Sequence, residues 1–131
     1  MVRRGVGLYS MAQHVQAPEA ALSLLAAAAA KLRESMALSK TDLRVFNALG
    51  DTFAAQGEAH LSAGQHAPAA AAFECALGAD GYGGALRIVK NDVDATIGLA
   101  ETHLSIARLM AAQEAQVRWP TQRESCRLVT L

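Results

Sequence analysis

The sequence predicts an all-α protein built of stacked antiparallel helical hairpins, with about five helices. Three observations support this fold class. Apolar residues recur at spacings of three, four and seven through most of the chain, as they do on amphipathic helices. Nowhere does an alternation of apolar and polar residues persist with β-branched side chains, so strands are not expected. Two segments with the same pattern lie fifty residues apart, which indicates an internal repeat.

Composition places the chain among ordinary folded proteins and argues against two classes of partner. Its 131 residues suffice for one domain with a core of its own. Twelve basic and twelve acidic residues give a formal net charge of zero, so no global attraction to nucleic acid or to an anionic membrane is expected. Only 5% of residues are aromatic while 52% are apolar, which predicts closely packed helices with small side chains between them.

The two cysteines and the N-terminal arginines bear on the compartment. Cys75 and Cys126 form no C-x-x-C pair and suggest no disulfide framework, which favours a reducing compartment, cytoplasmic or nuclear. Cys75 lies within an apolar helical pattern and is expected to be a small core residue. Arg3 and Arg4, with no acidic residue before the first helix, leave organelle import open. The apolar run Ala20–Ala30 is too short for a membrane span, and none is expected.

The first predicted helix begins at Pro18, because proline lacks only a donor that the first helical turn leaves unbonded anyway. Glu19 follows with a charge that suits the helix dipole. Leucine, methionine and alanine then recur with helical spacing to residue 38. The segment "SKTD", which ends in Asp42, supplies N-cap chemistry for a second helix that runs from about Leu43 toward Ser62.

A third helix is expected from Pro68, with Phe73 on its apolar side. The stretch Gly78–Gly84 marks where the helical pattern bends or frays, since a glycine inside a helix costs about 1 kcal/mol relative to alanine. "ALRIV" continues the pattern, "KND" ends it, and a long last helix runs from Val93 to residue 116. We therefore expect a helical repeat domain at residues 18–116. It lies between an N-terminal segment 1–17, partly helical or disordered, and a polar tail 117–131.

The internal repeat is visible residue by residue. "DLRVFNALGDTF" begins at Asp42 and "DVDATIGLAETH" begins at Asp92. Within them, "LGDT" at residues 49–52 matches "LAET" at residues 99–102. The preceding elements, "RESMALSKTD" and "GGALRIVKND", match as well. Such a repeat predicts hairpins that bury their apolar faces by stacking on one another.

The pattern resembles the tetratricopeptide repeat (TPR) family over residues 20–112. The residues that fall on its small, aromatic and apolar packing positions are Phe46, Leu49, Gly50, Phe53, Phe73, Ala76, Tyr82, Ala85, Leu99 and Ala100. Two features depart from the family. The period is fifty residues where the family's is about 34, and Lys90 stands where a terminal proline is usual. The resemblance therefore implies degenerate, long-period units of a TPR-like α-solenoid.

The resemblance also implies a function, that of a protein-interaction module or scaffold component that binds a partner segment in its concave face. The groove positions of the family fall here on Arg44, Asn47, Asp51, Asp94, Ile97 and Glu101. Family members that bind a carboxylate at these positions use lysine and asparagine, whereas Asp51 and Glu101 are negative. We therefore expect the groove to prefer basic or apolar segments over acidic C-termini. Neighbouring TPR units and self-association are further expected kinds of contact.

Two alternatives remain open. Within the same architecture, "DVDATIGLAETHLSIARL" is similar to repeats in the large TPR scaffold of the superkiller RNA-decay complex. From another class, the chain is a nucleotide-binding protein or enzyme that uses Gly78–Gly84. That stretch lacks the Lys-Ser or Lys-Thr of a phosphate-binding loop, and Leu86 stands where the third glycine of a dinucleotide fingerprint belongs.

Catalysis, a metal and a cofactor are not expected. The four histidines, His14, His60, His66 and His103, form no H-E-x-x-H motif. His60 and His66 are six residues apart and do not share a helix face. Glu101 and His103 are two residues apart and point in different directions on a helix, so they do not form a catalytic pair.

Overall fold

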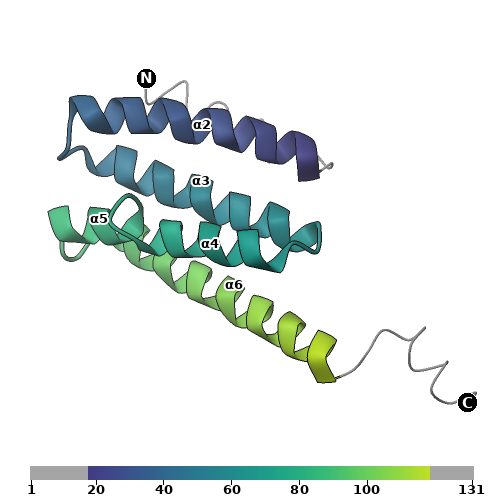
Figure 1. Ribbon diagram of the computed structural model, residues 1–131. Coiled ribbons are helices and arrows are strands. Elements are labelled where there is room, and N and C mark those ends of the chain that lie inside the picture. The colour runs from purple at the N-terminus through teal and green to yellow at the C-terminus, as the bar shows by residue number, and fades with distance from the viewer. Residues whose placement is uncertain (1–17, 119–131) are drawn as a thin grey trace, which may run out of the picture.

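The computed structural model describes residues 18–118 (Figure 1). Its five helices are α2 (Pro18–Leu38), α3 (Leu43–Ser62), α4 (His66–Leu77), α5 (Tyr82–Ile88) and α6 (Val93–Arg118). They confirm the all-α class of stacked helical hairpins. The last helix ends at Arg118 and so continues beyond the predicted end at residue 116. The expectations for residues 1–17 and 119–131 lie outside the described residues.

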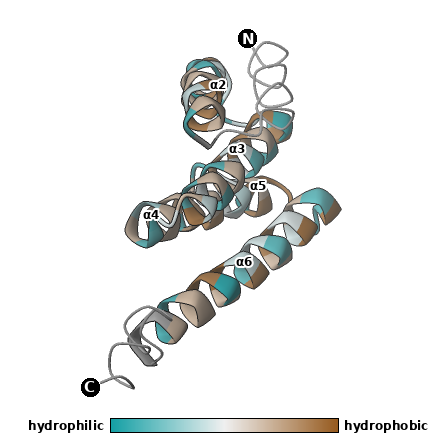
Figure 2. Cartoon of the chain, turned by 90° about the vertical axis from the view of Figure 1, so that its right-hand side faces the viewer, coloured by the Kyte–Doolittle hydropathy of each residue, from teal (hydrophilic) through white to brown (hydrophobic). Residues whose placement is uncertain are grey.

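The helices stack in chain order, and successive long helices run antiparallel (Figure 1). The helix α3 packs between α2 and α4, and α6 packs against α3, α4 and α5. Figure 2 shows α2 and α6 at opposite edges of the stack. One face of α6 therefore has no neighbour among the described helices. None of the helices between residues 18 and 118 combines the length and apolar character that a membrane span needs.

The two matching segments begin in the same way, at an aspartate that caps a helix. The Asp42 carboxylate accepts a hydrogen bond from the Arg44 amide (3.1 Å), and the Asp92 carboxylate accepts one from the Ala95 amide (2.8 Å). Such bonds satisfy amides that the first helical turn leaves unbonded. The Arg44 guanidinium also forms an ion pair with Asp42 (3.2 Å), and this contact lowers the pKa of the Asp42 carboxyl. The repeat is thus reproduced at the starts of α3 and α6.

A buried threonine supplies a second correspondence between the two segments. The Thr52 hydroxyl donates to the Ala48 carbonyl (2.7 Å), and the Thr102 hydroxyl donates to the Gly98 carbonyl (2.8 Å). Both threonines are buried, where a hydroxyl without a partner would destabilise the fold. The shared sequence "L-[GA]-[DE]-T" therefore carries a shared local structure.

The glycine-rich stretch separates two helices. Helix α4 ends at Leu77 and α5 begins at Tyr82. The amides of Gly81 and Gly84 both donate to the Gly78 carbonyl, at 3.0 and 3.3 Å, which closes a compact turn. A Cβ added at Gly83 would lie 2.5 Å from the Leu77 carbonyl oxygen, so the turn leaves no room for a side chain there. The glycines that exceed the repeat pattern are thus explained by close backbone approach.

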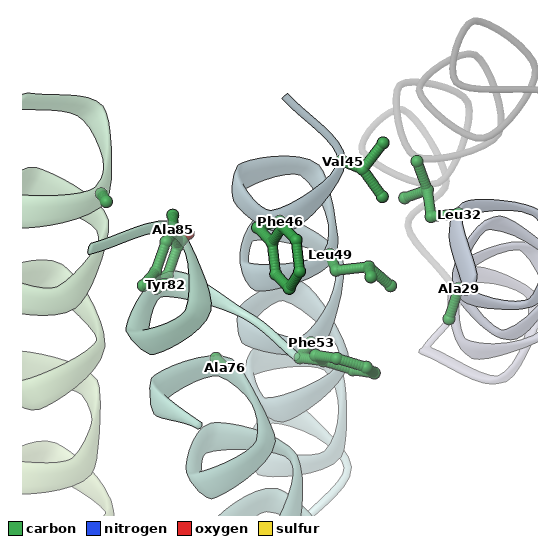
Figure 3. Packing of buried hydrophobic residues seen from close by; sticks show 10 residues of the cluster. Ala29, Leu32, Val45, Phe46, Leu49, Phe53, Ala76, Tyr82 and Ala85 are labelled. Atoms are coloured by element: carbon green, nitrogen blue, oxygen red, sulfur yellow. The ribbon is translucent and has the colours of Figure 1, made fainter. Parts of the chain in front are cut away.

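The main core extends along α3, with α2 on one side and α5 on the other (Figure 3). Figure 3 shows Phe46, Leu49 and Phe53 projecting from α3 between α5 and α2. A second cluster joins Phe73 of α4 to Leu109 of α6. Eight of the ten predicted packing residues are buried: Phe46, Leu49, Gly50, Phe53, Phe73, Ala76, Tyr82 and Ala85.

Three expectations about burial need correction or refinement. Leu99 is only partly buried, and Ala100 is exposed because it lies on the face of α6 that no described helix covers. Cys75, expected in the core, is exposed on α4. The periodic pattern identified Cys75 as part of an apolar helix, but not which side of that helix a neighbour would cover.

Candidate functional site

The ring of Tyr82 is the wedge that sets the distance between α3 and α6. A Cβ added at Gly50 of α3 would lie 2.7 Å from the ring, and one added at Gly98 of α6 would lie 2.9 Å from its Cδ1 atom. Both glycines are therefore required by the close approach of Tyr82. Gly50 was expected to act in packing, but Gly98 was missed. The signal for Gly98 was its place as the single glycine in the long last helix.

The phenol of Tyr82 contacts the acidic part of the predicted groove. Its hydroxyl donates a hydrogen bond to Oδ1 of Asp51 on α3. Glu101 and Asp94 of α6 act on the same carboxyl through their charges. The structure thus brings together three of the six predicted groove residues, from segments that are fifty residues apart. We call Asp51, Asp94 and Glu101 the acidic cluster.

Burial and like charge both act on Asp51. Partial burial is the largest influence and raises the pKa of the Asp51 carboxyl above its ordinary value of 3.8. The Tyr82 hydrogen bond lowers that pKa, because it stabilises the carboxylate form. The charges of Glu101 and Asp94 raise it further. The neighbouring charges that act on Asp51 are thus negative, and a bound cation would relieve this repulsion.

Two more polar contacts join α6 and its cap to α3. The Asn47 side-chain amide donates to the Asp92 carboxylate (3.0 Å), and the Ser105 hydroxyl donates to the Glu58 carboxylate. These contacts lie toward either end of the acidic cluster along α3. Glu58 was missed by sequence reasoning, because nothing in its local pattern separates it from a solvated helix residue.

The remaining predicted groove residues have different roles. Arg44 forms an ion pair with its own helix cap, Asp42, and Asn47 binds Asp92, so both side chains have partners within the chain. Ile97 is about half exposed on α6. Among the predicted groove positions, Asp94, Ile97 and Glu101 thus follow helical spacing on α6 and place an apolar side chain between two negative ones.

Replacing Asp51 with asparagine is expected to raise the free energy of unfolding at neutral pH by up to about 1 kcal/mol, the scale of a partly solvated charge interaction. Asparagine removes a charge repelled by Glu101 and Asp94 and keeps an acceptor for Tyr82. Because the folded-state pKa is raised, the folded chain binds this proton more tightly than the unfolded chain. The contribution of Asp51 to stability therefore falls as pH rises from 3.8 through the folded-state pKa.

Urea titrations of both proteins at neutral pH and near pH 4 measure this effect. The advantage of the asparagine variant should be largest at neutral pH and shrink at the lower pH, where a larger fraction of the wild-type carboxyl is protonated. An advantage that grows on acidification would contradict the assigned direction of the pKa shift.

A depression lies over α3, between α2 and α4. It has a volume of about 310 Å³ and is lined mainly by alanines, with Phe53 and Cys75 as parts of its wall. The Arg33 guanidinium lies 5.2 Å from the centre of the Phe53 ring, a cation–π distance. Within residues 18–118, no three His, Cys, Asp or Glu side chains are arranged to hold a metal ion. The acidic cluster is thus the candidate site with the clearest chemical character.

Comparison of the chain with protein-family models, with curated proteins and with solved structures finds no match.

Proposed function

We propose that this chain is a protein-interaction module whose α3–α6 face binds a basic segment of a partner protein. The observation that carries the proposal is the acidic cluster. Asp51 lies on α3 and Asp94 and Glu101 lie on α6. Burial and the charges of Glu101 and Asp94 raise the pKa of the Asp51 carboxyl. Positive charge from a partner would offset their repulsion, and exposed Ile97 offers an apolar contact beside them.

The internal repeat supports the same face. Asp51 and Glu101 occupy equivalent positions in the two segments, so negative charge recurs along one side of the stack. In a TPR-like solenoid this side is the concave, ligand-binding one. A scaffold role in a reducing compartment is part of the same proposal, since it rests on the same resemblance and on the cysteine usage.

The alternative that uses Gly78–Gly84 gains no support from the geometry. A phosphate cradle needs backbone amides that point at the ligand. Here the amides of Gly81 and Gly84 donate to the Gly78 carbonyl, and the Ala85 amide donates to the Gly81 carbonyl. These three donors are already used within the turn.

Fluorescence anisotropy with a labelled peptide of alternating lysine and leucine tests the proposal on the full chain. We expect saturable binding that weakens with added salt, because exposed charge interactions are screened. Glu101→Gln should weaken the affinity about fivefold, the equivalent of ~1 kcal/mol for one charge contact. The matched control is Glu74→Gln on the exposed side of α4, which should leave the affinity unchanged.

A peptide with glutamate in place of lysine serves as the second control and should not bind. Equal binding of both peptides, or equal effects of the two glutamate substitutions, would remove the acidic cluster from the proposed function.

A further inference from the structure

The outward face of α6 carries a seam of apolar side chains that the described part of the chain leaves uncovered. The seam follows the alternating four–three spacing of a coiled coil. Its residues are Val93, Ile97, Ala100, Leu104, Ala107 and Ala111. All six are exposed, and the three larger ones keep 66%, 51% and 54% of their surface in solvent. A helix with such a face is suited to pack against another helix.

The seam lies opposite the face by which α6 joins its own chain. The residues buried toward α3, α4 and α5 are Ala95, Gly98, Thr102, Ser105 and Leu109. These positions also follow three–four spacing, shifted by about half a turn from the seam. Figure 2 shows α6 at the edge of the stack, so approach to the seam is open. Intramolecular packing thus uses a face of α6 made mostly of small residues and leaves the apolar seam uncovered.

The internal repeat limits what can cover the seam. On α3, Gly50 and Gly57 receive the rings of Tyr82 and Phe73, and a Cβ at either glycine would lie within 2.9 Å of ring atoms. The equivalent residues on α6, fifty positions later, are Ala100 and Ala107. Their methyl groups occupy the space that such rings would need. A hairpin with aromatic rings therefore cannot dock on α6 as α4 and α5 dock on α3.

We propose that a second copy of this chain covers the seam, with the two α6 helices antiparallel across a two-fold axis. In this register Leu104 lies opposite the partner's Ala100, and Ile97 lies opposite the partner's Ala107. Val93 lies opposite the partner's Ala111. Every layer then sets a large side chain against a methyl group, so the seam is complementary to itself, as a two-fold interface requires.

Charges along one flank of the seam fit the same register. Asp94 lies beside the partner's Arg108, and the two-fold axis makes this contact twice. Glu101 lies beside the partner's Glu101 near the axis, where like charges repel. On the other flank His103 lies beside the partner's His103. The register thus predicts attraction toward the ends of the interface and repulsion at its centre.

The proposed interface is small. The nineteen residues from Val93 to Ala111 span about 28 Å of helix. Contact along a single helix pair of this length falls at the low end of specific interfaces. We therefore expect a reversible dimer with a dissociation constant in roughly the micromolar range, and a monomer on dilution.

Sedimentation equilibrium of the full chain over a range of concentrations tests the proposal. The apparent mass should rise from 13.7 kDa toward twice that value. Leu104→Lys should keep the chain monomeric, and circular dichroism should confirm that this exposed substitution leaves the fold intact. Glu74→Lys, an exposed change on α4, is the matched control and should dimerise as the wild type does. A monomer at every concentration, or a dimer that Leu104→Lys leaves unchanged, would overturn the proposal.

Charge reversal tests the antiparallel register. Asp94→Arg alone and Arg108→Asp alone should each weaken the dimer at least about tenfold, because each sets like charges side by side. The double variant should restore dimerisation, and failure of this rescue would overturn the register. Glu101→Gln should strengthen the dimer while it weakens binding of the basic peptide. The two proposals share Ile97 and Glu101, so the peptide is titrated against the dilute monomer, where a change in its affinity cannot come from dimerisation. This keeps the inference, which does not depend on the proposed function, distinguishable from it.

Discussion

Replacing Tyr82 with alanine should lower the free energy of unfolding by about 3–5 kcal/mol, the cost of deleting a large buried aromatic side chain. Tyr82 is only 3% exposed, and its ring fills the space between Gly50 and Gly98. Neither glycine has a side chain that could enter the cavity, and the two helices cannot close it without breaking contacts elsewhere. Chemical denaturation at low protein concentration measures the loss.

Tyr82→Phe is the matched control for the ring. It keeps the wedge and removes the hydroxyl that donates to Asp51, so it should cost about 1 kcal/mol. It should also raise the pKa of the Asp51 carboxyl further, because the donor that stabilises the carboxylate is lost. If the alanine variant were no less stable than the phenylalanine variant, the wedge would not be what joins α3 to α6.

Replacing Gly57 with alanine should lower the free energy of unfolding by about 1–3 kcal/mol, as overpacking of a core does. Helix propensity alone predicts the opposite, a gain of about 1 kcal/mol for alanine over glycine. Overpacking wins because the new Cβ would lie 2.5 Å from Cδ1 of Phe73, a fully buried ring packed against Leu109. The same denaturation measurement decides between the two effects.

The repeat supplies an internal control for this substitution. Ala107 lies fifty residues after Gly57 and is exposed, so Ala107→Gly should also destabilise the monomer, by about 1 kcal/mol through propensity alone. In addition, Phe73→Leu should reduce the penalty of Gly57→Ala in the double variant, since the residues are in contact. A stabilising Gly57→Ala would show that the ring of Phe73 can move aside.

Much of the fold follows from local chemistry that the sequence displays. Pro18 opens the first helix, and Asp42 and Asp92 cap two others, because the bonds involved join residues only two or three positions apart. The fifty-residue repeat can also be recognised in the sequence, because equivalent helices carry equivalent capping aspartates and buried threonines. The residues of Gly78–Gly84 were recognised as a break, although the carbonyl oxygens that exclude their side chains became visible only in three dimensions.

The candidate site was predicted in part. Asp51 and Glu101 were placed on one face by their equivalence in the repeat. The hydrogen bond from Tyr82 to Asp51 was not predicted, because it joins residues 31 positions apart. The pairing of Arg44 with Asp42 was not predicted either, although these residues are only two positions apart. The sequence by itself determined the helices, their caps and their repetition, because these depend on contacts within a few residues. Only the tertiary structure decided which helix faces are covered. Burial depends on neighbours distant in the chain, so Cys75 and Ala100 lie exposed on apolar helices while Tyr82 lies buried between two glycines.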